Sequence, residues 1–274
     1  MAGIAARDRM CRNCSLAEEV YSHAKNGTIL LMMVDSGYYY QFLNSYYIGN
    51  LRMYDNLLVV CLDIKSFNKL TRLHVPSVFF KKKINTYVEQ FTVQGSPLFV
   101  EKMRLKLDII LTALLNGFNV LYMDSDIVLR RDPFPYLFGL ESYDMLVQRD
   151  VSICAGFMFL YARDPVIRLV KLAASYKMDD QPALNRAYKE TNEMKLLFLP
   201  ENVFSSGKVF WGTHSFYWDP IDPQQIMIHN NYIRYRELKD YRLKEMHLYA
   251  LDIDGEYSNP NARYLTIETI SGLR

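Results

Sequence analysis

The chain has 274 residues, of which 50% are hydrophobic, and its 32 basic and 30 acidic side chains leave a formal net charge of +2. That length and composition provide a sizeable core for one large α/β domain or two small ones, and they exclude a fibrous chain. The weak net charge gives no field that would attract nucleic acid, and no stretch approaches the roughly 20 apolar residues that span a bilayer, so we expect a soluble chain as given.

Residues 1–27 precede the first predicted strand, and their start lacks the apolar core of a signal peptide. Cys11 and Cys14 have the spacing of half a zinc site, which needs a second pair to be complete. Asn13 and Asn26 begin triplets that fit the glycosylation acceptor pattern, but such triplets occur by chance in most chains of this size. The sequence of these residues therefore indicates no specific function.

Two units of strand, turn and helix follow. The first strand covers residues 28–34 and ends at Asp35, where Ser and Gly predict a turn, and a helix is expected over 38–47. The second strand covers residues 57–62, ends at Asp63 and leads into an amphipathic helix. Alternation of this kind predicts a parallel sheet with crossover helices, an α/β fold.

A third unit ends in two carboxylates. Apolar residues at helical spacing predict a helix over 101–116 with Asn116 as its C-cap, and a buried strand over 119–123 leads directly to Asp124 and Asp126. Two acids spaced i, i+2 at a strand end can share one Mg²⁺ or Mn²⁺ ion that keeps positions open for a diphosphate. Acids are also common turn formers at strand ends, so the pair by itself fits either role.

Another acid nearby has an ordinary structural reading. Asp132 followed by Pro133 predicts the N-cap and first position of a helix.

Beyond the acid pair, strands are predicted over 144–147 and 155–161, and the glycine at position 156 would let a ligand approach the backbone. Asp164 opens a helix, and Asp180 is expected to cap the next one. Residues 200–223 are rich in Gly, Ser, Trp and Pro and predict a long irregular segment of a binding region.

A histidine completes a potential cation site. The strand-like residues 225–228 end at His229, which with Asp124 and Asp126 supplies two oxygen ligands and one nitrogen ligand; imidazole favours Mn²⁺ over Mg²⁺. Taken alone, a histidine here is more often structural.

Two further cysteines have an ordinary interpretation. Cys61 and Cys154 lie in apolar, strand-like contexts and are expected to be small buried residues.

Three pieces of sequence in one order resemble a known family. They are residues 120–128 around the acid pair, residues 180–185 beginning Asp180-Gln181-Pro182, and residues 229–233 beginning at His229. This pattern resembles eukaryotic nucleotide-diphospho-sugar transferases, the group that includes plant and algal cell-wall xylosyl- and arabinosyltransferases. The resemblance implies a retaining enzyme of the GT-A fold, a Rossmann-like mixed sheet flanked by helices.

The same resemblance implies domain limits and a compartment. Residues 28–250 would form the transferase domain, residues 1–27 an N-terminal segment that remains from a stem, and residues 251–274 a C-terminal extension. Members of this group work in the Golgi lumen, and the usual membrane anchor is absent from the chain as given.

Residue roles follow from matching positions. Asp124, Ser125 and Asp126 would bind the donor, the two carboxylates also binding the metal together with His229. Gly156 would lie against the donor.

Charged residues from four further places complete the implied donor site. Lys106 and Lys239 would neutralise the leaving diphosphate, and Asp35 and Asp63 would contact the nucleoside. Asp180 and Gln181 would face the sugar and the acceptor as catalytic groups; at Arg234 and Tyr235 the chain departs from relatives, which carry smaller residues there.

We therefore expect a metal-dependent retaining glycosyltransferase that moves xylose, arabinose or galactose from a UDP-sugar to a glycan or glycoprotein, with Mn²⁺ as its cofactor and Mg²⁺ as the alternative. A cation and lysines can stabilise a leaving diphosphate without a proton donor. One rival is a nucleotide-sugar-binding protein without turnover. Another is a phosphatase of the haloacid dehalogenase type with Asp124 as nucleophile, although that motif belongs on a first strand and about 90 residues of α/β pattern precede it here.

Overall fold

The structure is a computed structural model, and it describes residues 15–81, 92, 95–191, 193–214 and 221–251. The strands are β1 (Thr28–Val34), β2 (Leu57–Cys61), β3 (Ser77–Phe79), β4 (Asn119–Met123), β5 (Ile127–Leu129), β6 (Met145–Asp150), β7 (Ser152–Leu160), β8 (Leu196–Leu199), β9 (Phe204–Ser205) and β10 (Met227–His229). The helices are α1 (Leu16–His23), α2 (Tyr39–Ile48), the 3₁₀ turn η1 (Leu51–Met53), α3 (Ile64–Arg72), α4 (Pro97–Leu115), α5 (Phe134–Phe138), α6 (Asp164–Ser175), α7 (Asp180–Thr191), α8 (Gly207–Thr213) and α9 (Arg236–Glu245).

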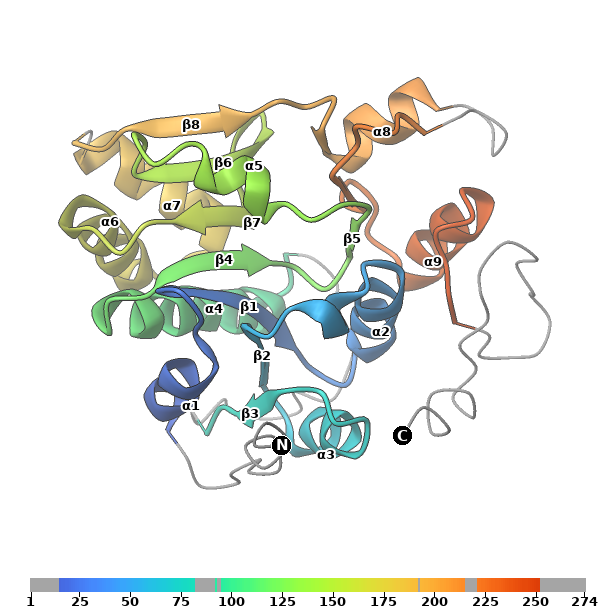
Figure 1. Cartoon of the computed structure of the whole chain (residues 1–274), viewed down its shortest axis with the longest axis horizontal. Coiled ribbons are helices and arrows are strands. Elements are labelled where there is room, and N and C mark those ends of the chain that lie inside the picture. Colours follow the sequence, from blue (N-terminus) through green and yellow to red (C-terminus); the bar gives the residue numbers. More distant parts are fainter. Residues whose placement is uncertain (1–14, 82–91, 93–94, 192, 215–220, 252–274) are drawn as a thin grey trace, which may run out of the picture.

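Seven strands form one mixed sheet in the order β3-β2-β1-β4-β7-β6-β8 (Figure 1). Strands β2, β1 and β4 are parallel neighbours, as the strand and helix alternation predicts. Strand β7 runs antiparallel to β4, so its first residues lie at the sheet edge where β1, β2 and β4 end. The predicted fold, a mixed sheet flanked by helices, is confirmed.

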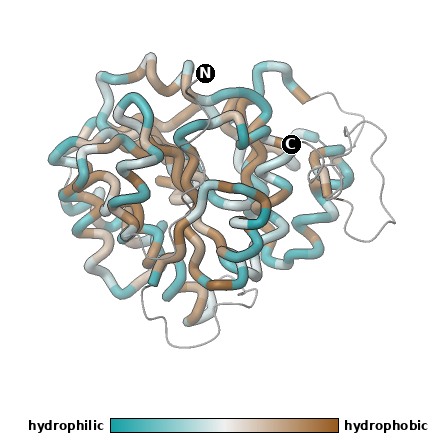
Figure 2. The backbone as a smooth tube through the Cα atoms, turned by 60° about the horizontal axis from the view of Figure 1, so that its bottom comes forward, coloured by the Kyte–Doolittle hydropathy of each residue, from teal (hydrophilic) through white to brown (hydrophobic). Residues whose placement is uncertain are grey.

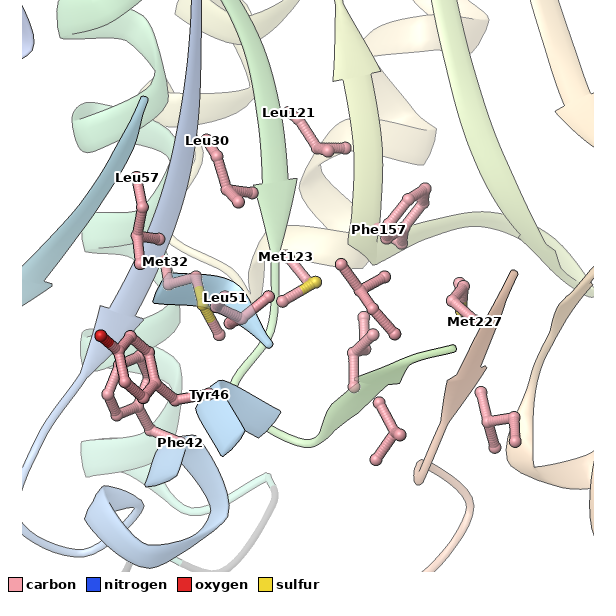
Figure 3. Packing of buried hydrophobic residues seen from close by; sticks show 14 of the residues in the cluster. Leu30, Met32, Phe42, Tyr46, Leu51, Leu57, Leu121, Met123, Phe157 and Met227 are labelled. Carbon is pink, nitrogen blue, oxygen red and sulfur yellow. The ribbon is translucent and has the colours of Figure 1, made fainter. Parts of the chain in front are cut away.

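Both faces of the sheet are covered, because alternate residues of the fully buried strand β1 enter two different cores. Leu30 and Met32 belong to one core and Ile29 and Leu31 to the other. Figure 3 shows Leu30, Leu121 and Phe157 from neighbouring strands packed side by side on the first face. Figure 2 shows the hydrophobic residues, in brown, gathered mainly in the interior of the molecule and the hydrophilic residues, in teal, mainly toward its outside.

A small second sheet, in the order β5-β10-β9, lies beyond the end of β4. Strand β10 is antiparallel to β5, and His229 is paired with Ile127. The amide of Asn230 also donates to the carbonyl of Asp126 at 3.0 Å. This pairing brings the end of β10 against the residues that follow β4.

The helix before β4 begins earlier than predicted. Ser96 caps α4 by accepting from the amide of Phe99, and Pro97 occupies the first helical position, where its missing N–H costs nothing. The helix therefore starts four residues before position 101. Its end is as predicted: Asn116 is the C-cap, and Gly117 adopts a φ of +82°.

Three local predictions were wrong. Residues 200–223 contain β9 and α8 and are not wholly irregular, because Ser206 caps α8 by accepting from the amide of Val209. Asp180 is the first residue of α7 rather than its cap. The cap of α5 is Pro133, and Asp132 instead accepts from the amide of Phe134 at 3.1 Å.

Helix α1 lies within the predicted N-terminal segment. Ser15 and Glu18 form a reciprocal capping box at its start. Val20 is fully buried in the same core as α4. Cys11, Cys14 and Asn13 lie outside the described residues, as does the predicted extension from position 252 onward. Among the helices that are described, none is long and apolar enough to cross a membrane.

Candidate active site

A pocket of ≈ 580 Å³ opens at the edge of the large sheet where β1, β2 and β4 end. It is lined by most of the residues that the sequence singled out, and by several that it did not. The predicted residues in its lining are Asp35, Lys106, Asp124, Ser125, Asp126, Gly156, Asp180, Gln181, His229 and Lys239. Asp63 is absent from that lining.

The three predicted metal ligands meet in one place. Asp124, Asp126 and His229 each present a ligand atom, and these atoms all lie within 4.8 Å of one another. The Nε2 atom of His229 is 3.3 Å from Asp126 Oδ1, and its other ring nitrogen lies 2.8 Å from the amide oxygen of Gln148. A second hydrogen bond of this kind fixes the orientation of a metal-binding imidazole. The donor set fits a Mn²⁺ ion.

The charge on His229 depends on its carboxylate neighbour. Burial by itself lowers the pKa of His229, but Asp126 and then Cys154 raise it to about 10. The imidazole is therefore protonated at neutral pH while it faces Asp126. A cation bound at Nε2 would have to displace that proton.

Gly156 is required by the close packing around this cluster. A Cβ atom at this position would lie 2.3 Å from His229 Cε1 and 2.8 Å from Asp124 Oδ2. The glycine carbonyl also accepts from the amide of Asp124 at 2.8 Å. The absence of a side chain therefore lets β7 approach two of the three candidate ligands.

We expect Gly156→Ala to displace His229 and to weaken Mn²⁺ binding by about tenfold or more, because ligand orientation is disturbed. Isothermal titration with Mn²⁺ measures this effect. Gly212→Ala is the matched control, since a Cβ there meets nothing within 4 Å. Equal Mn²⁺ affinity in the two variants would contradict the prediction.

Lys106 joins two carboxylates beneath the pocket. Its Nζ atom lies 2.9 Å from Asp124 Oδ1 and 2.5 Å from Asp180 Oδ2. The side chain is only 2% exposed, and its Nζ also donates to the carbonyl of Ala155 at 3.3 Å. Burial opposes the charge, yet Asp124 and Asp180 hold the pKa of Lys106 well above its usual value. Lys106 thus links α4 to the residue after β4 and to the first residue of α7.

Lys239 is the second basic residue at the site. It ion-pairs with Asp126 and donates to the carbonyl of Asn230 at 2.9 Å. Burial raises the pKa of Asp126, but Lys239 and His229 outweigh it and hold that pKa far below the usual range. Asp126 is therefore ionised throughout the physiological range.

The two acids predicted to contact a nucleoside differ in their surroundings. Asp35 lines the pocket, pairs with the buried Lys102 at 2.5 Å and accepts from the amides of Gly37 and Tyr38. Asp63 instead caps α3 by accepting from the amide of Ser66 at 2.7 Å.

The remaining acceptor capacity of Asp63 is also used. Ser36 donates to it through both its backbone amide and its hydroxyl. Asp63 thus fastens the loop after β1 to α3.

Ser125, the residue between the two acids, is buried and fixed through its backbone. Its carbonyl accepts from the hydroxyl of Ser45 at 2.9 Å, and that hydroxyl also reaches the carbonyl of Ile127. Helix α2 therefore holds the turn that carries Asp124 and Asp126.

The two cysteines in apolar strands are buried, as predicted. Cys61 and Cys154 both carry free thiols.

The structure adds several pocket residues that sequence reasoning missed. Asp150 accepts from the side-chain nitrogen Nε2 of Gln181 at 3.3 Å and from the hydroxyl of Tyr232. Asp179 lies beside Asp180 in the lining. Asp150 is the last residue of β6 and follows Gln148 and Arg149, so it lacks the apolar run that directly precedes Asp35 and Asp124. The sequence therefore contains no comparable signal for it.

The carboxyl group of Asp179 has an unusually high pKa. Burial, and then the charge of Asp180, raise its pKa from the usual 3.8 to about 7. Between these two values the folded chain binds a proton that the unfolded chain has lost. Stability contributed by this group therefore falls as the pH rises from about 4 to 7.

Asp179→Asn should remove this pH dependence. We expect the stability of the variant relative to the wild type to increase from pH 4.5 to pH 7 and then to level off. Thermal unfolding of both proteins across this range measures the difference. A difference that stays constant with pH would show that Asp179 titrates in its ordinary range.

Comparison with known proteins adds independent information. A family model described as nucleotide-diphospho-sugar transferase matches residues 52–243, more than half of the chain. UDP-D-xylose:L-fucose alpha-1,3-D-xylosyltransferase 3 of Arabidopsis thaliana is 26% identical over 283 residues, in an alignment that covers 88% of this chain and 71% of the relative. UDP-galactose:fucoside alpha-3-galactosyltransferase of Dictyostelium discoideum is also 26% identical, over 56% of this chain and 28% of that protein.

The fold also resembles a solved structure. The WbbM bifunctional glycosyltransferase in its apo form aligns with a TM-score of 0.50 and 14% sequence identity, over 76% of this chain and 46% of that one. At this identity the likeness concerns the fold alone. It agrees with the mixed sheet and its flanking helices.

Proposed function

Because the chain belongs to the nucleotide-diphospho-sugar transferase family and is a glycosyltransferase, we propose that it is a Mn²⁺-dependent retaining enzyme that uses UDP-xylose. UDP-galactose and UDP-arabinose are the alternative donors within the same proposal. The relatives named above are described as acting on L-fucose or a fucoside, so we take a fucose-bearing glycan or glycoprotein as the acceptor.

The observation that carries the proposal is the convergence of Asp124, Asp126 and His229 inside the pocket. These three residues would hold the metal, with Mg²⁺ as the alternative ion. Once bound, the cation supplies positive charge to a leaving diphosphate, so no residue has to donate a proton to it. Lys239, which contacts Asp126, extends this positive region.

Asp180 and Gln181 are assigned to the donor sugar. Asp180 is neutralised by Lys106, so its carboxylate is suited to orienting sugar hydroxyls rather than to attacking carbon. The Gln181 amide is fixed at both ends, because its oxygen accepts from the amide of Ala155 at 3.3 Å and its nitrogen donates to Asp150. A fixed amide is the kind of preorganised dipole that stabilises developing charge.

The two rival functions predict different observations. A phosphatase of the haloacid dehalogenase type would carry Asp124 after its first strand, whereas β1, β2 and β3 precede β4 here. A binding protein without turnover would retain Mn²⁺-dependent binding of UDP and release none from a UDP-sugar. Turnover thus separates the second rival from the proposal.

The test is UDP release from UDP-xylose, UDP-galactose and UDP-arabinose, each with Mn²⁺, Mg²⁺ or a chelator. We expect UDP-xylose to be turned over, fastest with Mn²⁺ and not at all with the chelator. Methyl α-L-fucoside should raise the rate and become xylosylated with retention of the anomeric configuration. Mn²⁺-dependent UDP binding without release from any donor would favour the binding protein instead.

We also propose residence in the Golgi lumen, on the resemblance to plant cell-wall transferases. Co-localisation of the tagged protein with a Golgi marker tests this. A uniform cytosolic signal would contradict it.

A further inference from the structure

The pocket extends along one edge of the large sheet, so the residues that line it follow the order of the strands. Asp35 follows β1, Asp124 follows β4, Gly156 lies in β7, and Asp150 ends β6. These strands are neighbours in the order β1-β4-β7-β6. Under the function proposed above, on which this inference rests, the nucleoside takes the β1 end and the diphosphate takes the metal ligands beside β4. The β6 end then remains for the acceptor.

Tyr232 is the aromatic residue of the pocket lining at that end. It belongs to the segment after His229, and its side chain is half-exposed at 48%. Its hydroxyl donates to Asp150, whose other carboxylate oxygen accepts from Gln181. One carboxylate therefore joins the ring of Tyr232 to a residue assigned to the donor sugar.

The backbone is unusual on both sides of this contact. Tyr232 has a φ of 61°, and Val151, next to Asp150, has a φ of 45°. Aromatic and β-branched residues rarely adopt such left-handed conformations, which cluster at functional sites. The β6–β7 pairing also changes register between Val147 and Arg149, and irregularities of this kind re-aim side chains next to active sites.

We propose that Tyr232 is the platform on which the acceptor sugar stacks, and that Asp150 is the positioning residue that fixes its ring. A half-exposed tyrosine ring offers a flat apolar face, and holding its hydroxyl on a carboxylate removes the rotational freedom that a ligand would otherwise have to restrict. The fitting ligand is a neutral sugar with an apolar C–H face. Fucose, with its methyl group, is such a sugar.

The test is steady-state kinetics with UDP-xylose and methyl α-L-fucoside for Tyr232→Ala, Tyr232→Phe and Asp150→Asn. Tyr232→Ala should raise the acceptor KM by about tenfold, because the stacking face is lost. Tyr232→Phe and Asp150→Asn keep the ring but lose the hydrogen bond that holds it, so they should raise the acceptor KM by about threefold through lost preorganisation. For the two Tyr232 variants the donor KM should change much less, and kcat should stay near the wild-type value. Asp150→Asn also loses the charge that holds the Gln181 side chain, so its kcat should fall as well.

Tyr235→Ala is the matched control. Tyr235 is 58% exposed, lies three residues further along and is absent from the pocket lining, so both KM values should stay at the wild-type level. An unchanged acceptor KM in Tyr232→Ala would overturn the proposal, as would an equal rise in the donor KM. If Tyr232→Ala fails to fold, Tyr232→Phe decides the matter: a rise in the acceptor KM alone supports the platform, and no rise overturns it.

Failure of this inference is distinguishable from failure of the function. A wild-type protein that releases UDP, but whose rate no monosaccharide glycoside in a panel raises, would reject the acceptor platform and leave donor turnover standing. A wild-type protein that turns over no donor would reject both.

Discussion

Replacing Asp126 with alanine is expected to lower Mn²⁺-dependent UDP release by at least about a hundredfold. One Asp126 oxygen lies 3.3 Å from His229 Nε2, and the other is paired with Lys239. Its loss removes one metal ligand and leaves two buried basic groups facing each other. The cation and the diphosphate should therefore both bind more weakly, which titration with Mn²⁺ and then with UDP measures directly.

A second variant at this position separates the effect of losing the carboxylate charge from the effect of losing the side-chain volume. Asp126→Asn keeps the volume of the side chain but loses its charge, and it should resemble the alanine variant in Mn²⁺ affinity. The control is Asp132→Asn, an exposed acid outside the pocket that lies after β5. Turnover near the wild-type rate in both Asp126 variants would mean that the acid pair is a structural turn after all.

Lys106→Met is expected to reduce both stability and activity. The lysine is almost fully buried and is shared between Asp124 and Asp180, so methionine fills the space but leaves two carboxylates without their cation. Removal of one partner from a buried ion pair costs about 3–5 kcal/mol in the free energy of unfolding. UDP release should fall by at least about a hundredfold, since the orientation of both acids is lost. Urea unfolding and donor turnover are the two measurements.

A double-mutant cycle tests the cause of that loss. Asp180→Asn in the Lys106→Met background removes one of the stranded charges, so it should recover part of the stability. Lys65→Met, an exposed lysine of α3, should be nearly neutral. If Lys65→Met and Lys106→Met lowered the free energy of unfolding by the same small amount, the interaction of Lys106 with its two acids would contribute little to stability.

Local sequence determined the framework of the site. The short apolar run before Asp124, rich in residues that favour strands, predicts a buried strand, and the helix pattern ending at Asn116 indicates where that strand begins. Alternating strands and helices require the ends of β1 and β4 to share one edge, so Asp35 and the acid pair had to be near each other. His229 was placed by the order of motifs in the chain.

The tertiary structure alone decided how the charges are shared. Asp35 and Asp63 occupy equivalent positions after neighbouring strands, yet one faces the pocket and the other caps α3. Nothing periodic in the sequence relates Lys106 to Asp180, or Asp150 to Tyr232.

These pairs form because packing brings together elements that are distant in the chain, and burial then makes an unpaired charge costly. Hydrophobic spacing encodes which residues turn inward and where each element ends. It does not encode which acid receives which base. That choice depends on side-chain reach and burial, and these quantities exist only once the sheet, α4, α7 and the segment after β10 have assembled.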